Sequence, residues 1–332
     1  MHDRFPGTFR LVLDTGGTIG LIRLELARQL QLKQLGTARL NLLQGHKQYP
    51  IFVVPDLTFA NQVRQPVSTI AGVDNVRFLD GAVGSIAAGA LTAGNCELDF
   101  DAGEWRIYRD GPPDRTGWAR YPDGIFKYGN ANGSAFLAAD ATLGGRPFRF
   151  GLDTGMPSRM RVYRKAAEAA GLWDAPRWAP TAPEGKGRLV RTSLRLANAT
   201  VEDVLVTLVN EPDWGAFPNG VIGLPVLRLF NIATNASEKT VFLKRNARAP
   251  EPQSYNRAGL WIDRAGSAVT IGVVGAGSPA VKAGLAAGDR LIGADFDSLL
   301  RQFSDAAGTE IMLNVERAGV RREVRLVLED FL

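Results

Sequence analysis

Histidine and cysteine are almost missing from this chain of 332 residues. It has two histidines, His2 and His46, and one cysteine, Cys96. A single cysteine excludes an intrachain disulfide and a cysteine-based zinc site. Two histidines leave almost no room for a His-dependent catalytic triad or a multi-histidine metal site. Acid–base chemistry would then fall to carboxylates, lysine or tyrosine, and we expect no metal and no cofactor.

Long apolar runs are also missing. No stretch of 18 apolar residues occurs, so we expect no membrane span. The first seven residues lack the apolar core of a signal peptide, which makes a cytoplasmic location the default expectation. The chain carries 39 Lys and Arg against 34 Asp and Glu, a net charge of +5 without a dense basic run. That diffuse charge argues against nucleic acid as a partner.

What is present is an internal repeat. Leu13-Asp14-Thr15-Gly16 reappears as Leu152-Asp153-Thr154-Gly155, with 139 positions between the two aspartates (153 minus 14). Asp80-Gly81-Ala82-Val83-Gly84 is matched at the same offset by Asn219-Gly220-Val221-Ile222-Gly223. Two motifs in one register predict that the first two thirds of the chain arose by duplication.

Each half shows the same order of elements. An apolar strand leads into Asp-Thr-Gly, a short helix follows, and β-like runs separated by turn residues lead to a closing strand. The halves are therefore expected to be mainly β. The expected strands are 9–13, 51–54, 67–70 and 104–108 in the first half, and 148–152, 189–196, 204–209 and 240–243 in the second.

The C-terminal quarter differs from both halves. A proline-rich stretch at 246–253 indicates a linker. Beyond it, strands are expected at 268–274, 310–316 and 322–328, with short helical stretches at 279–283 and 297–306. This is the pattern of a small α+β unit.

The repeated motif has a clear chemical use. Two lobes packed about a pseudo-two-fold axis would bring Asp14 and Asp153 together, and two adjacent carboxylates cannot both ionise. They would share one proton, so one could activate water while the other donates to a carbonyl oxygen. The apolar-apolar-Gly segments would pack beneath these loops. The alternative is that each Asp only caps its own turn, for which Asp-Thr-Gly is also suitable.

On these motifs the chain resembles bacterial retropepsin-like aspartic peptidases that carry two lobes and a C-terminal PDZ domain. The resemblance implies two pseudo-two-fold-related, acid-protease-like β-barrel lobes plus a small α+β PDZ domain. It implies catalytic roles for Asp14 and Asp153. It also implies supporting roles for Thr15, Gly16, Thr18, Gly84, Thr154, Gly155 and Gly223. The implied divisions are 1–111, 112–246, a linker at 247–256, and the PDZ domain at 257–332.

Two departures from the family pattern stand out. Met156 and Pro157 follow the second Asp-Thr-Gly, where the family has small residues, and Pro157 removes a backbone donor. The first Asp is preceded by 13 residues, whereas 124–149 before the second is long enough for a β-hairpin. An early strand is thus expected to be missing from the first lobe. Relatives are typically exported, so an upstream leader would imply a periplasmic or cell-envelope location.

The PDZ resemblance carries its own site. Gly259, Leu260, Trp261 and Ile262 occupy the position of the loop that binds a peptide C-terminus through backbone N–H groups. Trp261 replaces the commoner glycine, and the alternative is a domain that only packs on the lobes. The leading hypothesis is an aspartic endopeptidase with peptide or protein substrates. The alternative is a catalytically impaired peptide-binding protein.

Overall fold

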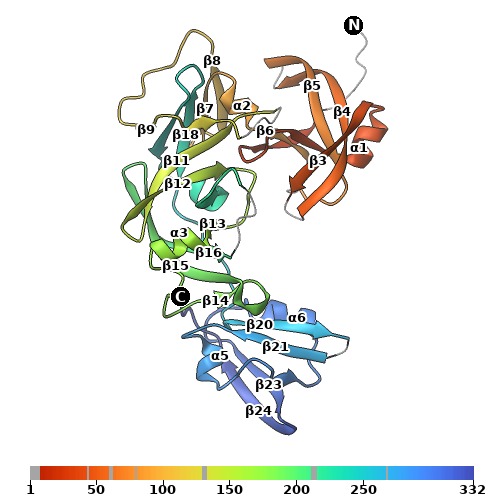
Figure 1. Ribbon diagram of the computed structural model, residues 1–332, viewed down its shortest axis with the longest axis vertical. Helices are drawn as coiled ribbons and strands as arrows, with labels where there is room; N and C mark the ends of the chain where they lie inside the picture. The colour runs from red at the N-terminus through yellow and green to blue at the C-terminus, as the bar shows by residue number, and fades with distance from the viewer. Residues whose placement is uncertain are drawn as a thin grey trace. The chain divides into compact units, whose positions relative to one another are not determined.

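The computed structural model describes residues 8–42, 45–59, 63–78, 81–128, 133–210, 215–266 and 268–332. The predicted fold class is confirmed, since the described residues are mainly β, with short helices (Figure 1). The chain forms two compact units. Unit 1 comprises 1–139, 151–157 and 227–247, and unit 2 comprises 140–150, 158–226 and 248–332. The domain boundaries expected from the sequence remain a prediction.

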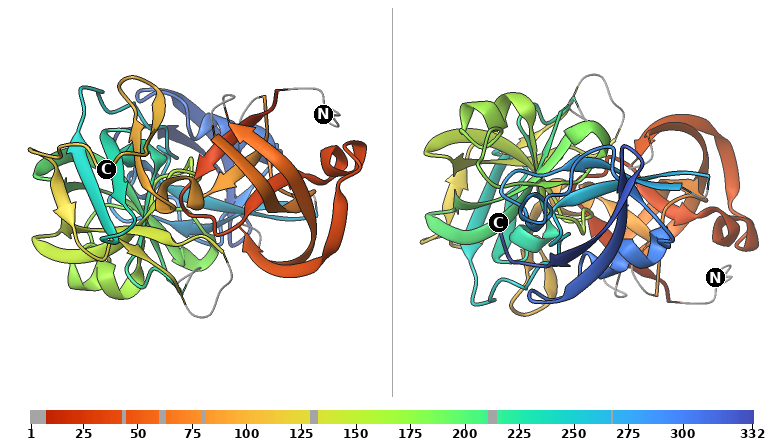
Figure 2. Two further views of the ribbon diagram at one scale, coloured as in Figure 1. Left: turned by 90° about the horizontal axis from the view of Figure 1, so that it is seen from above. Right: turned by 90° about the horizontal axis from the view of Figure 1, so that it is seen from below.

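The first sheet belongs to unit 1 and has six strands in the order β1-β6-β2-β5-β4-β3. Its long curved ribbons are red to orange in Figures 1 and 2. Apolar residues from β2, β4, β5 and the first helix form one core cluster, which includes Ile22, Ala27, Phe52 and Ile70. The elements are β1 (Arg10–Asp14), β2 (Gly20–Arg23), α1 (Leu24–Gln29), β3 (Lys33–Leu42), β4 (Gly45–Phe59), β5 (Val63–Val73), β6 (Ala82–Ala87) and α2 (Gly89–Thr92).

A five-stranded sheet in the same unit joins segments far apart in the sequence. Its order is β8-β7-β18-β19-β9, and β18 pairs with β7 in antiparallel register. The two closing strands expected from the sequence, 104–108 and 240–243, both belong to this sheet. The elements are β7 (Asn95–Asp99), β8 (Glu104–Tyr108), β9 (Ala119–Tyr121), β18 (Phe230–Asn235) and β19 (Thr240–Arg245).

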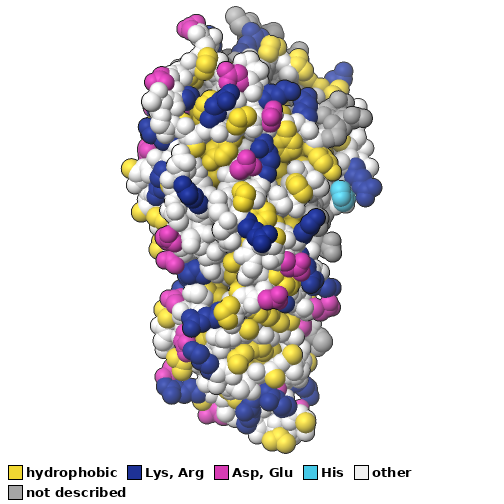
Figure 3. All heavy atoms as spheres, turned by 60° about the vertical axis from the view of Figure 1, so that its left-hand side comes forward, with side chains coloured by type: hydrophobic (Ala, Val, Ile, Leu, Met, Phe, Trp, Pro, Cys, Tyr) yellow, Lys and Arg dark blue, Asp and Glu magenta, His cyan; other side chains and the backbone are white. Residues whose placement is uncertain are grey.

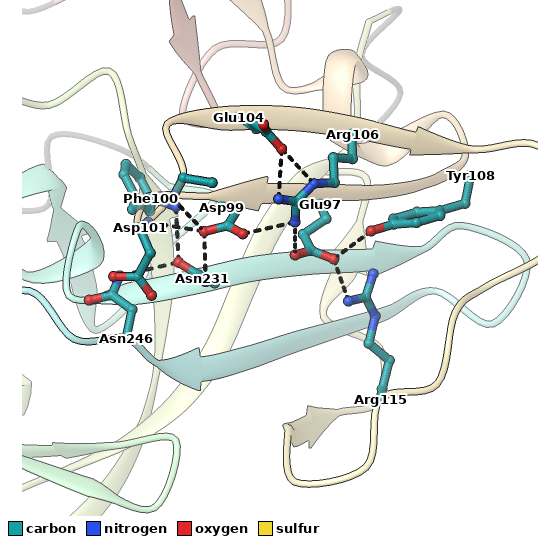
Figure 4. Close-up of polar contacts among 11 residues, drawn as sticks. Glu97, Asp99, Phe100, Asp101, Glu104, Arg106, Tyr108, Arg115, Asn231 and Asn246 are labelled. Carbon is teal, nitrogen blue, oxygen red and sulfur yellow. Dashed lines mark hydrogen bonds and ion pairs between the residues drawn. The ribbon is translucent and has the colours of Figure 1, made fainter.

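A buried polar network crosses this five-stranded sheet (Figure 4). Glu97 is 5% exposed and accepts hydrogen bonds from Arg106 (2.9 Å), Tyr108 (2.9 Å) and Arg115 (2.5 Å). Asp99 extends the network by accepting from Arg106 at 2.8 Å. Because Arg106, Tyr108 and Arg115 all donate to Glu97, this buried carboxylate holds the strands and the following loop together.

Unit 2 contains most of an eight-stranded sheet in the order β10-β11-β12-β17-β13-β16-β15-β14. An additional pairing of β11 with β15 closes six of its strands into a barrel, as Thr142 pairs with Arg195 and Leu143 with Leu194. The elements are β10 (Ile125–Phe126), β11 (Phe136–Leu143), β12 (Arg146–Asp153), β13 (Met160–Tyr163), α3 (Arg164–Ala169), β14 (Ala179–Pro180), the 3₁₀ turn Pro183–Gly185, β15 (Gly187–Leu196), β16 (Ala199–Val209), β17 (Gly220–Gly223) and α4 (Leu224–Leu227).

The last part of unit 2, blue in Figure 1, is a five-stranded antiparallel sheet with two short helices. Both helices are capped as the sequence favours, because Ser278 and Asp295 each accept a backbone N–H three residues ahead. The strands agree with those predicted. The elements are β20 (Leu260–Ala265), β21 (Ala268–Val274), α5 (Pro279–Lys282), β22 (Arg290–Leu291), α6 (Phe296–Gln302), β23 (Glu310–Arg317) and β24 (Val320–Val327).

This C-terminal part packs on the preceding part of unit 2. Phe331 and Tyr255 are buried in one cluster with Ala179, Leu189 and Leu205, which lie in or beside β14, β15 and β16. A backbone hydrogen bond from Trp178 to Ala276 (3.2 Å) joins the same two parts. The C-terminal sheet is therefore fixed to the barrel by a shared apolar core and by main-chain bonding.

The surface shows no sign of a single-charge field on the face seen in Figure 3, where Lys and Arg side chains are scattered among acidic and apolar ones. This agrees with the diffuse charge of the sequence. Within the described residues, no helix has the length and apolar character needed to cross a membrane.

Candidate active site

Each Asp-Thr-Gly follows directly from a strand. β1 ends at Asp14 and β12 ends at Asp153, and both aspartates belong to unit 1. β1 pairs in parallel with β6, which brings Gly84 opposite Leu11. A Cβ at Gly84 would overlap the carbonyl of Leu21, so only glycine allows β6 to pack this closely against β2. The register of β1 with β6 therefore places this glycine segment beside the strand that leads to the first Asp loop.

The two threonines join the loops by reciprocal hydrogen bonds. The Thr15 hydroxyl donates to the Leu152 carbonyl (2.7 Å) and accepts from the Thr154 N–H (3.0 Å). The Thr154 hydroxyl donates to the Leu13 carbonyl (2.5 Å) and accepts from the Thr15 N–H (3.2 Å). Both threonines and Leu152 are buried, and unpaired polar groups in such a position are costly. The four bonds therefore fix the spacing of the two loops.

The threonines bring the two aspartates together. The side chains of Asp14 and Asp153 hydrogen-bond to each other. Each carboxyl also accepts from its own loop, Asp14 from the Gly16 N–H at 3.0 Å and Asp153 from the Gly155 N–H at 2.9 Å. Both glycines are required by space, because a Cβ at either one would overlap the opposite carboxyl group. The arrangement of donors is the same in both loops.

The pKa values of both carboxyl groups are raised. Burial, and after it the charge of the neighbouring Asp14, raises the pKa of Asp153 to about 8. Burial also raises the pKa of Asp14, against hydrogen bonds from Gly16 and Asp153 that lower it. Asp153 is 7% exposed and Asp14 is partly exposed. These directions are those expected of two carboxyl groups at one buried site, where the charge on one disfavours the charge on the other.

Met156 and Pro157 leave the second turn similar to the first. The Met156 N–H donates to the Asp153 carbonyl (3.4 Å), as the Gly17 N–H donates to the Asp14 carbonyl (3.3 Å). The Met156 side chain is 6% exposed and packs inward, while Pro157 is exposed. Thr18 acts through its backbone, since its carbonyl accepts from the Ser134 N–H (2.9 Å).

Gly223 lies in the strand that pairs with β12, which ends at Asp153, whereas the predicted peptide-binding loop belongs to the C-terminal sheet. Gly223 ends the buried strand β17. Leu260 and Ile262 point into the core of the C-terminal sheet, whereas Trp261 is half-buried and its indole N–H donates to Asp263 (2.9 Å). The Gly259 N–H is already bonded to the Asn256 side chain (3.0 Å). The predicted peptide-binding loop thus keeps its first N–H for an internal contact.

Sequence analysis missed the carbonyl acceptors of the site. Leu13 and Leu152 were assigned only as strand residues, and no side-chain pattern marks a main-chain carbonyl as a partner for a distant threonine. Among the described residues, no group of three or more His, Cys, Asp or Glu side chains could hold a metal ion. Cys96 is buried, and burial raises the pKa of its thiol.

The threonine bonds make a direct prediction. Thr15→Val keeps the shape but leaves the Leu152 carbonyl and the Thr154 N–H without their partner, so we expect the free energy of unfolding to fall by about 2–4 kcal/mol. Thr15→Ser retains the hydroxyl and should cost less than half as much. Denaturant unfolding of the three proteins measures this, and equal stability of the Val and Ser variants would contradict the structural role.

Comparison with known proteins gives no argument about function. No family model matches the chain, and no curated protein matches it. Among solved structures, it is similar to a retropepsin-like aspartic protease from Rickettsia conorii, with 16% sequence identity and a TM-score of 0.27. The similarity covers 38% of this chain and 90% of that one. Values this low carry no functional argument, so any function must be argued from the geometry of the site.

Proposed function

We propose that the protein is an aspartic endopeptidase that hydrolyses peptide bonds with Asp14 and Asp153. The single observation that carries this proposal is the hydrogen-bonded pair of carboxyl groups, each held by its own Asp-Thr-Gly loop. We assign the proton of the pair to Asp153, because burial and the charge of Asp14 raise the pKa of Asp153. A turn-capping role explains the bond from each glycine N–H. It does not explain why two such turns are locked together with their carboxyl groups in contact.

In the proposed reaction, the ionised Asp14 removes a proton from water as the water oxygen attacks the peptide carbonyl carbon. Asp153 donates its proton to the carbonyl oxygen, which yields a neutral tetrahedral diol. The carbon–nitrogen bond then breaks as the nitrogen takes a proton from Asp14, and Asp153 recovers its proton from the diol. All steps use the two carboxyl groups, in line with the scarcity of histidine and cysteine.

For residues 257–332 we propose a PDZ-like domain that positions the barrel to which it is fixed. The apolar cluster around Phe331 and Tyr255 supports positioning. Peptide capture has less support, because the Gly259 N–H is occupied and Arg264 of β20 forms an ion pair with Asp297 of α6 (3.0 Å). Arg264 also stacks on Phe296, so it lies between the strand and the helix where a bound peptide would add.

The experiment is a casein digest with the purified 332-residue chain at pH 4 to 7, beside a variant carrying Asp14→Asn and Asp153→Asn. We expect the unmodified chain to cleave casein and the variant to show no cleavage above background, because the substituted side chains cannot exchange the proton. Equal cleavage by both proteins would reject the proposal. Binding of casein by both without any cleavage would instead support the peptide-binding alternative.

A further inference from the structure

The sheet that carries Asp14 has two unpaired edges facing one cavity. β1 lies at one end of the strand order, so among the described residues no strand pairs with its outer side. β3 pairs with β4 only as far as Val53, which leaves Val54–Phe59 without a partner on that side. Unpaired strand edges present rows of N–H and C=O groups that another strand can bind.

The barrel in unit 2 shows what occupies the corresponding position. There β11 lies beside β12, the counterpart of β1, and pairs with the end of β15, the counterpart of β4. The strand orders β1-β6-β2-β5-β4 and β12-β17-β13-β16-β15 match step by step. Among the described residues, the first sheet therefore has counterparts of five of the six strands of this barrel.

The burial of β12 and β1 agrees with an open position beside β1. The last four residues of β12, Phe150–Asp153, are all buried. Their counterparts in β1, Leu11–Asp14, are all half-exposed. The difference arises because β11 covers β12, whereas no described strand covers β1.

A cavity of about 570 Å³ lies at the open position, entirely within unit 1. Leu11 of β1 and Val54 and Leu57 of β4 line it, and so does Ser85 of β6. Ser85 is 3% exposed, and its hydroxyl has no hydrogen-bond partner within the described part of the chain. A buried, unpaired hydroxyl on a residue that lines a cavity indicates that another group completes the site.

Charge specifies the missing strand further. In the complete barrel, Arg149 of β12 forms an ion pair with Asp140 of β11 (3.6 Å). At the repeat offset of 139, Arg149 corresponds to Arg10 of β1. Arg10 is exposed and has no ion-pair partner among the described residues. A strand that fills the open position should therefore carry an acidic residue opposite Arg10.

We propose that the open position between β1 and β4 binds an extended strand of another polypeptide, whose apolar residues fill the cavity and whose acidic residue faces Arg10. Binding adds main-chain hydrogen bonds to both edges and closes the first barrel. The strand would also cover β1, which leads directly to Asp14. The inference does not depend on peptide hydrolysis, since it rests on strand pairing alone.

The test uses a synthetic peptide with the sequence of residues 134–143, which contains β11, and a photoreactive group at the position of Phe136. It is added to the 332-residue chain carrying Asp14→Asn and Asp153→Asn, so that any cleavage is avoided. We expect saturable binding by fluorescence anisotropy and cross-links to β1 or β4. A scrambled peptide that binds equally well, or cross-links confined to β15, would overturn the proposal.

Two pairs of variants test the details. Leu57→Arg places a charge in the cavity and should weaken binding at least tenfold, whereas Val67→Arg, at a position 69% exposed on β5, should not change it. Arg10→Glu should weaken binding about two- to fivefold, as expected for a cross-strand ion pair. A peptide with Lys in place of Asp140 should recover that loss on the Arg10→Glu chain. Failure of the charge exchange, with binding otherwise unchanged, would reject the register.

Discussion

Asp153→Asn should stabilise the protein, and the gain should grow as the pH rises. The native pKa of Asp153 is about 8 against an ordinary value of 3.8. Between these values the folded protein holds a proton on Asp153 that the unfolded chain has released. The free energy of unfolding therefore falls by about 1.4 kcal/mol per pH unit from this residue. Asn does not titrate, so the variant escapes this loss.

The size and sign are both testable. The stability contributed by protonated Asp153 is complete below pH 4 and is lost as the pH rises to about 8, so the advantage of the variant should increase steadily over this range. Denaturant unfolding at several pH values measures it. The activity of the unmodified chain should also fall as the pH rises through about 8, because the pair of carboxyl groups then loses its proton.

Asp289→Asn provides a control of opposite sign. A hydrogen bond from Arg317 lowers the pKa of Asp289, which is 1% exposed, so its contribution is present above the ordinary pKa and lost as the pH falls. This variant should be less stable than the parent at pH 7 and approach it in acid. If Asp153→Asn followed the same trend, the raised pKa of Asp153 would be wrong.

The register of the duplication predicted the essential geometry. Because strand, turn and glycine recur at one offset, a symmetric packing of the two repeated motifs is enough to place Asp14 beside Asp153. The short stretch before Asp14 predicted that the first lobe lacks an early strand, and this stays a prediction; among the described residues no strand pairs with the outer side of β1. These features follow from local patterns that are compared within one chain.

Other features depend on contacts that no local pattern records. The pairing of β7 with β18 joins residues more than 130 positions apart, and the donors around Glu97 come from β8 and from a loop at Arg115. Hydrophobic alternation identifies each strand but does not choose its neighbour. The sequence also could not predict how Met156 affects the second Asp-Thr-Gly turn, because the hydrogen bond from its N–H depends on backbone geometry.

Gly16→Ala should abolish most of the proposed activity. The added methyl group would overlap all three terminal atoms of the Asp153 side chain, which cannot move away without breaking its bond to Asp14. A displacement of about 1 Å costs on the order of 100-fold in rate. The overlap should also lower the free energy of unfolding by about 1–3 kcal/mol.

Gly155→Ala places a methyl group against Asp14 in the same way and should have a matching effect. Gly94→Ala is the control in the same unit, because an added Cβ there meets nothing within 4 Å. Casein hydrolysis and the pKa values of the two carboxyl groups, measured by carbon NMR, give independent readouts. We expect hydrolysis to be lost and the two pKa values to shift in the Gly16 and Gly155 variants, and neither to change in Gly94→Ala. That result would show that the reaction depends on the close contact of each loop with the opposite carboxyl group. Full retention of the shared proton in Gly16→Ala would mean that the dyad tolerates a looser fit than the structure implies.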